Sequence, residues 1–215
     1  MSPAGDDFGN SGDHDDHGNS GDHGDRLAAT VGFRRMVDGT ADDYALIDRH
    51  DERSADRQAD RVLGWLAAMD GPSPYQVSRL HHSLQTATRA EADGADAETI
   101  VCALLHDIGD ELSPRNHAEV AAAVLRPYVG ERNHWIVRHH GLFQGYYWLH
   151  HYGRDRNERD RFRQHQWYRD AVEFCARWDQ ASFDPDYPTA PLSYFEPLVV
   201  DLFAAPRREP AASLL

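Results

Sequence analysis

The heptapeptide ALLHDIG, residues 103–109, places a histidine and an aspartate side by side at the end of an apolar segment. Apolar residues recur at helical spacing from Ile100 to Leu105, which predicts a buried helix that ends near Gly109. An ionised carboxylate in apolar surroundings is costly unless a cation neutralises it. The chain contains no lysine, so an arginine or a metal ion must neutralise Asp107.

The composition limits both the fold and the function. A chain of 215 residues with 40% hydrophobic content suits one globular domain with a substantial core. Residues 1–25 carry seven aspartates and no cationic residue, so the remainder holds 36 − 7 = 29 acidic and 22 basic residues. This acidic balance argues against nucleic acid or an anionic membrane surface as a partner. The absence of lysine also excludes a Schiff-base lysine and a phosphate-loop lysine.

The cysteines and the hydropathy pattern indicate where the protein resides. Cys102 and Cys175 are the only cysteines and lie in separate apolar runs, so neither a disulfide framework nor a cysteine-ligated zinc site is expected. No apolar stretch approaches the roughly 18–20 residues that span a bilayer, and the N-terminus is acidic rather than basic. The sequence therefore predicts a soluble, cytoplasmic protein.

The predicted organisation is a single all-α helical bundle between two tails. Residues 1–28, rich in Asp, Gly and His, are expected to be disordered, 29–206 to form the helical domain, and 207–215 to be flexible. Thr40, Asp96 and Asn116 are candidate N-caps. No strand is expected, because the aromatic run 146–148 has no partner strand. Helices are predicted over about 40–70, as one helix or two, and over 76–93, 96–106, 116–125, 131–139, 142–151, 166–181 and 192–204.

A second inward-facing acid is Asp179. It continues a helical stripe of apolar residues that begins at Ala171, at positions i, i+3, i+4, i+7 and i+8. An inward aspartate needs a partner, so either Arg177 or another arginine neutralises it, or it is a metal ligand. Histidines add further candidate ligands: 11 lie outside the first 25 residues, among them His81, His82, His117, His139 and His140.

The pattern H…HD…H…H…D in an all-helical chain resembles the HD-domain superfamily of metal-dependent enzymes. The resemblance spans about residues 75–203. Within it, the segments His82-Ser-Leu-Gln85-Thr-Ala87 and 103–109 resemble the branch of mixed-valent di-iron oxygenases, which includes inositol oxygenases and organophosphonate-cleaving oxygenases.

The resemblance implies a dinuclear metal site. One metal would be held by His82, His106, Asp107 and Asp179, and the second by Asp107, His117 and His140, so that Asp107 bridges the two ions. The resemblance implies two iron ions, although imidazole and carboxylate ligands also suit manganese, cobalt, nickel and zinc. It further implies catalytic contributions from Asp107, Gln85 and Gln144.

Two ligand positions stay open when the residues alone are considered. His81 lies nearer than His82 to the apolar face centred on Leu80 and Leu84, and His139 and His140 present the same ambiguity. The resemblance favours His82 through its His-x-Leu-Gln-x-Ala motif, and favours His140 because that residue directly precedes Gly-Leu-Phe-Gln144.

The chain departs from the organophosphonate-cleaving relatives at their anion site. Those relatives carry a lysine a few residues after the last ligand histidine, and a second histidine after the Asp-Ile-Gly turn. The corresponding positions here hold Gln144 and Asp110, and Tyr75 falls where a glutamate is found in the relatives. A phosphonate substrate is therefore not favoured.

Three classes of function follow from this reading. The leading prediction is a di-iron oxygenase that uses dioxygen to oxidise or cleave a small hydroxylated molecule. The alternative is a metal-dependent phosphohydrolase that acts on a phosphate ester with the same ligands. A third class is a helical binding or regulatory protein in which the metal only stabilises the fold.

Overall fold

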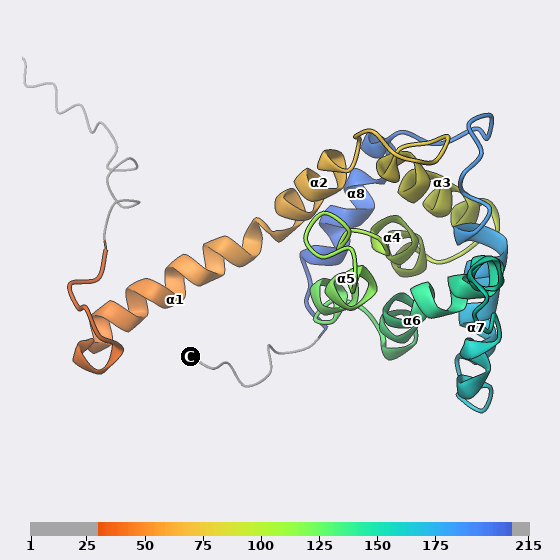
Figure 1. The fold of residues 1–215 in the computed structure, drawn as a ribbon. Coiled ribbons are helices and arrows are strands. Elements are labelled where there is room, and N and C mark those ends of the chain that lie inside the picture. Colours follow the sequence, from red (N-terminus) through yellow and green to blue (C-terminus); the bar gives the residue numbers. More distant parts are fainter. Residues whose placement is uncertain (1–29, 208–215) are drawn as a thin grey trace, which may run out of the picture. The chain divides into compact units, whose positions relative to one another are not determined.

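The computed structural model describes residues 30–207, and these residues contain helices but no strand (Figure 1). This confirms the all-α prediction. The tail predicted for residues 1–28 and residues 208–215 of the predicted flexible C-terminus lie outside the described residues. The described residues fall into two compact units, one up to Asp51 and one from Glu52 onward. No helix among them is both long and apolar enough to cross a membrane.

The first unit contains a short 3-10 helix, η1 (Met36–Asp38), and most of α1 (Ala41–Asp56). Thr40 caps α1 as predicted. Its Oγ1 accepts a hydrogen bond from the Asp43 N–H at 3.3 Å, and the Asp43 carboxylate accepts one from the Thr40 N–H at 2.9 Å. This reciprocal pair satisfies two backbone donors that the first turn leaves unpaired. The long segment from Thr40 is two helices, because α2 begins separately at Gln58.

The second unit holds all the other elements. They are α2 (Gln58–Ala68), α3 (Arg79–Ala92), α4 (Ala97–Leu105), α5 (His117–Leu125), α6 (Glu131–Trp148), the 3-10 helices η2 (Leu149–Tyr152) and η3 (Glu158–Phe162), α7 (Tyr168–Glu173), the π-helix η4 (Phe174–Asp179) and α8 (Leu192–Phe203).

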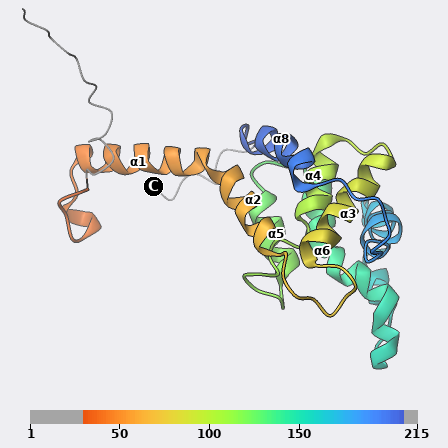
Figure 2. The same cartoon turned by 90° about the horizontal axis from the view of Figure 1, so that it is seen from above.

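Helix α4 is the centre of the second unit. Every residue from Thr99 to Leu105 is buried, and α4 packs against α3, α6 and α8 (Figures 1 and 2). A helix that is apolar on all sides is stable only when other helices surround it. Its start is fixed by Asp96, whose side chain accepts the Thr99 N–H at 2.8 Å as predicted. The core therefore holds the His106-Asp107 pair, which directly follows α4, in a fixed place.

Three predicted helix boundaries or caps differ from the structure. Helix α3 begins at Arg79, because the Ser78 side chain caps it by accepting the His81 N–H at 3.1 Å. Asn116 precedes α5, but its side chain makes no cap hydrogen bond. The segments predicted as 131–139 and 142–151 form one continuous helix, α6, followed by η2. Gly141 does not break α6, because packing of the flanking turns outweighs its low helix propensity.

The burial of α4 predicts a large stability effect for one substitution. Leu104 is fully buried, so Leu104→Ala is expected to lower the free energy of unfolding by about 2–5 kcal/mol, measured by urea denaturation. Leu112 is 59% exposed and provides a matched control, since Leu112→Ala should change stability by less than about 0.5 kcal/mol. Equal effects of the two substitutions would contradict the central position of α4.

Candidate metal centre

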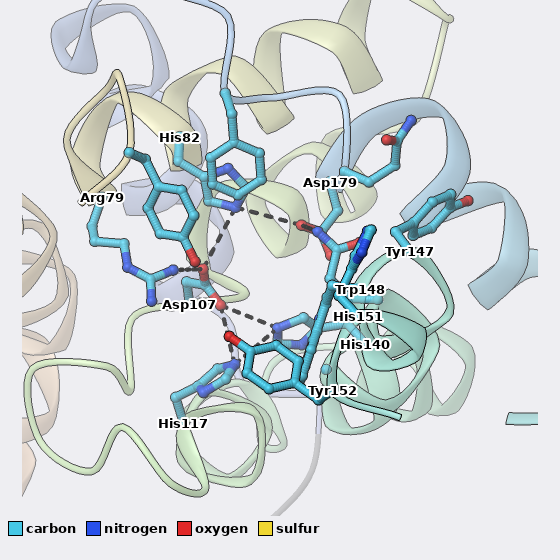
Figure 3. A pocket seen from close by; sticks show the side chains of 15 residues that line it. Arg79, His82, Asp107, His117, His140, Tyr147, Trp148, His151, Tyr152 and Asp179 are labelled. Carbon is cyan, nitrogen blue, oxygen red and sulfur yellow. Dashed lines mark hydrogen bonds and ion pairs between the residues drawn. The ribbon is translucent and has the colours of Figure 1, made fainter. Parts of the chain in front are cut away.

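Five separate elements bring six ligand-type side chains together. Figure 3 labels those that line the adjoining cavity: His82, Asp107, His117, His140 and Asp179. Helix α3 supplies one histidine, the end of α4 supplies the His-Asp pair, α5 and α6 supply one histidine each, and the π-helix supplies the last aspartate. All are buried except His117, which is half-buried at the first residue of α5. The six residues are His82, His106, Asp107, His117, His140 and Asp179.

Asp107 lies between two pairs of histidines. Its Oδ1 is 3.3 Å from His117 Nε2 and 3.1 Å from His140 Nε2. Its Oδ2 is 3.5 Å from His82 Nε2 and 3.6 Å from His106 Nε2. One carboxylate thus faces a different histidine pair with each oxygen, as a bridging ligand must.

Asp179 joins only one of these pairs. Its Oδ1 lies 3.5 Å from His82 Nε2 and 3.8 Å from His106 Nε2. The ligand-type atoms group into three sets, each with all its atoms within 4.8 Å. Two of these sets fall within the two predicted ligand groups. The third combines His106, His140 and Asp179, and so crosses between the groups.

When neutral, the four imidazoles share one tautomer, which leaves their inner nitrogens as acceptors. Each Nδ1 contacts a backbone carbonyl, which can only accept a hydrogen bond, so each Nδ1 carries the hydrogen. The contacts are His82 to Ser182 at 2.9 Å, His106 to Ala103 at 2.8 Å, His117 to Pro114 at 3.1 Å and His140 to Val137 at 2.7 Å.

In each pair of neutral rings the two inner nitrogens therefore face each other, and neither can donate a hydrogen bond. The Nε2 atoms of His82 and His106 are 3.1 Å apart, and those of His117 and His140 are 3.2 Å apart. Two lone pairs at this distance repel unless a proton or a metal ion lies with them. The donor set therefore fits two cations, one at each histidine pair.

Local backbone features place these side chains. A Cβ atom on Gly109 would lie 2.8 Å from the Cα of His117, so only glycine lets the turn after Asp107 approach the start of α5. Phe183 stacks on the His82 ring, with centroids 4.3 Å apart. The π-helix, a rare form that is frequently found at functional sites, ends at Asp179. Asp179 points inward as predicted, but it lies in a π-helical turn, which is wider than the α-helical turn that the prediction assumed.

Burial and mutual charge shift the protonation of the cluster. Burial lowers the pKa of His82 and lowers that of His106 strongly. Burial alone would raise the pKa of Asp107, but the histidines around it hold that pKa well below its usual value. Burial opposes a charge on His140, yet the hydrogen bond and charge of Asp107 outweigh this and raise its pKa to about 9. Burial, with the Asp107 charge adding to it, raises the pKa of Asp179 to about 7.

An arginine contacts one of the two buried aspartates, Asp107, but the arginine suggested for Asp179 lies elsewhere. Arg177 forms an ion pair with Asp93 at 2.8 Å, so it does not neutralise Asp179. The Asp179 carboxylate instead accepts the Gln144 amide at 2.8 Å and lies 3.7 Å from the Cys175 thiol. Asp107 does contact a guanidinium, that of Arg79, at 3.2 Å on one oxygen. Its other oxygen faces histidines only.

One histidine of each adjacent pair points into the cluster and the other points away from it. His81 points to Thr189, with Nε2 3.3 Å from Oγ1, and His139 stacks on Trp135 with its Nδ1 toward the Trp135 carbonyl. Neither belongs to the cluster, whereas His82 and His140 do. The histidines in the cluster are the two that the family resemblance favoured. The helical wheel alone favoured His81 over His82.

The two glutamines differ in position. Gln144 lines the cavity beside Asp179, and its buried Oε1 has no hydrogen-bond partner among the described residues. Gln85 does not line the cavity. Its amide donates to the Asp184 carbonyl and its Oε1 accepts the Asp184 N–H at 3.4 Å, so it fixes the loop after the π-helix. The structure therefore does not place Gln85 at the site, where it was predicted to act.

A cavity of about 850 Å³ opens onto the cluster, and some of its walls were not identified from the sequence. Arg79 is the only arginine among its lining residues, and Asp110 lies behind it in an ion pair at 2.8 Å. Arg79 could have been found, because it lies three residues before His82 and so on the same helix face. Aromatic residues form much of the remaining wall: Tyr75, Tyr147, Trp148, Tyr152 and Phe183.

Protons and metal ions compete for this site, which predicts a pH dependence. At pH 7 the His140 imidazole, with its pKa raised to about 9, carries a proton that must leave before Nε2 can bind a cation. Asp179, with its pKa raised to about 7, adds a second competing proton at lower pH. Divalent metal affinity is therefore expected to rise from about pH 6 to about pH 8, with proton release seen by calorimetry in buffers of different ionisation enthalpy. An affinity that does not change with pH would contradict this protonation pattern.

Comparison with known families agrees with this geometry. The HD domain family model matches residues 79–166, a segment that contains five of the six clustered side chains and ends before Asp179. No curated protein matches the chain. This segment is therefore similar to the HD domain family.

Proposed function

We propose that the protein is a di-iron oxygenase that uses dioxygen to oxidise or cleave a small, uncharged, hydroxylated molecule. The observation that carries the proposal is the pair of facing Nε2 contacts, 3.1 Å and 3.2 Å, on either side of one buried carboxylate. The cluster borders a cavity large enough for a small molecule. A site that only stabilised the fold would have no need of such a cavity.

Six side chains would hold two iron ions with coordination positions to spare. His82, His106, Asp107 and Asp179 would bind the first, and Asp107, His117 and His140 the second, which leaves fewer protein ligands than either ion accepts. When bound, iron would supply the reduction of dioxygen and the removal of hydrogen from a carbon that bears a hydroxyl group. The protein positions the substrate and limits water through the aromatic wall of the cavity.

The charges of the cavity favour an oxygenase over a phosphohydrolase. A phosphate ester brings about two negative charges and several strong acceptor oxygens. Arg79 is the only arginine that lines the cavity, and its guanidinium is already engaged by Asp107 at 3.2 Å and Asp110 at 2.8 Å. The chain has no lysine to add a cation. An uncharged substrate matches these walls better than a phosphate ester does.

Gln144 is suited to recognise a substrate hydroxyl group. Its amide nitrogen donates to the Asp179 carboxylate at 2.8 Å, which directs the amide oxygen the other way. Its oxygen is left at the cavity, buried and without a partner among the described residues. A buried acceptor of this kind is satisfied when a ligand hydroxyl donates to it.

Adjacent histidines allow a matched test of the metal centre. His82→Ala removes a buried ligand, so iron content and iron-dependent dioxygen uptake should fall by at least about tenfold after anaerobic purification. His81→Ala alters a neighbouring ring that contacts Thr189, so both quantities should stay near wild type. Activity is measured with a panel of polyols and amino alcohols in an oxygen electrode.

The same protein separates the oxygenase from the phosphohydrolase. Phosphate release from nucleotides and sugar phosphates under nitrogen, with manganese or cobalt, would refute the oxygenase proposal if no panel member supported dioxygen uptake. A mixed-valent iron spin signal together with substrate-dependent uptake would support it.

Gln144→Leu tests substrate recognition separately from metal binding. Loss of the acceptor oxygen should lower kcat/KM for dioxygen uptake, expressed per bound iron, by roughly tenfold on the substrate that wild type accepts. Iron content is measured alongside, because the substitution also removes the amide that donates to Asp179. An unchanged kcat/KM would show that the Gln144 oxygen does not bind the substrate.

A further inference from the structure

Four side chains form a closed ring of polar contacts beside the metal centre. Arg79 Nη1 lies 3.2 Å from Asp107 Oδ2, and Arg79 Nη2 lies 2.8 Å from Asp110 Oδ2. Asp110 Oδ1 is 3.3 Å from His117 Nδ1, and His117 Nε2 returns to Asp107 Oδ1 at 3.3 Å. The ring thus joins two candidate metal ligands to two residues that are not ligands.

The ring depends on where the sequence places Arg79 and Asp110. Arg79 is the first residue of α3 and lies one turn before His82, so it reaches the Asp107 carboxylate from the same face. Asp110 follows Gly109, whose missing Cβ lets this turn contact the start of α5. The Asp110 side chain is only 9% exposed, and a carboxylate at that burial requires a cation, which Arg79 provides.

His117 needs this support more than the other histidines do. It is the one clustered histidine that is half-buried, with a side chain 25% exposed, and it lies at the end of a helix. The other three are buried, and each Nδ1 contacts a backbone carbonyl alone. The His117 Nδ1 is shared between the Pro114 carbonyl at 3.1 Å and the Asp110 carboxylate at 3.3 Å.

From this geometry we propose that Asp110, held in place by Arg79, is a positioning residue for the second metal ion. The inference rests on the dinuclear site of the proposed function. Asp110 orients His117, while Arg79 holds Asp110 in place and orients Asp107 between the two histidine pairs. The first ion keeps His82, His106 and Asp179, none of which contacts Asp110, so it shares only the bridging Asp107 with the ring.

The alternative role for Arg79 is to anchor an anionic group of the substrate. Both of its terminal nitrogens already face carboxylates, which leaves this role less suited to the geometry. The two roles differ in a measurable way, since a substrate anchor would change KM and leave metal content intact.

The test compares Arg79→Gln and Asp110→Asn with Arg177→Gln in the full chain. Arg177 is a matched control because its ion pair with Asp93 lies outside the cavity lining. Cobalt binding is followed anaerobically by titration and visible absorption, with thermal unfolding of each apoprotein as the check on folding. Wild type and Arg177→Gln should bind two cobalt ions, whereas both ring variants should keep one and bind the second about 10- to 100-fold more weakly.

Arg79→Lys tests whether the geometry of the guanidinium matters, because a purely structural role would leave the second binding step unchanged in this variant. A single ammonium group cannot face both carboxylates as the guanidinium does, so this variant should restore the second binding step only in part. Two cobalt ions bound at wild-type affinity by folded Arg79→Gln and Asp110→Asn would overturn the inference, and so would loss of both ions. Failure of wild type to bind two ions would instead contradict the dinuclear site of the proposed function.

Discussion

The buried Asp107 carboxylate between two histidine pairs is the interaction on which the site depends. It is 4% exposed, and its pKa stays well below the usual value because imidazoles surround it. All four imidazoles direct the same nitrogen inward, since backbone carbonyls hold the opposite nitrogen. When the rings are neutral, this leaves acceptors facing acceptors, an arrangement that a proton or a bound cation relieves.

The apolar core and this polar cluster are parts of one arrangement. Helix α4 is buried on every side, and the His-Asp pair follows its last residue without a linker. Helices α3 and α6, which pack against α4, each deliver one histidine from an adjoining face. The positions of the ligands are therefore set by helices that pack against the buried α4, which restricts their motion and preorganises the centre.

The sequence predicted the elements of this site well where a local pattern identified them. The helix before His106, the caps at Thr40 and Asp96 and the inward direction of Asp179 follow from spacing and local chemistry. His82 and His140 required a family resemblance, because a helical wheel does not distinguish either from its neighbour. Gln85 shows the limit of that resemblance, since its amide holds the Asp184 backbone instead.

Contacts between distant segments could not be read from the sequence. The ion pair of Arg79 with Asp110 joins residues 31 positions apart, and nothing in either local pattern indicates the other. The continuity of α6 through Gly141 likewise depends on packing that propensity does not contain.

The π-helical turn makes the last aspartate sensitive to chain length. Its hydrogen bond from the Gln180 N–H to the Cys175 carbonyl, 3.0 Å, spans five residues instead of four. Each residue of a helix turns the chain by about 100°. Removing one residue from this turn would rotate Asp179 away from the histidines while leaving all six ligand-type residues in the sequence. An alignment gap here would therefore distinguish relatives with a different metal centre, even when their motifs are identical.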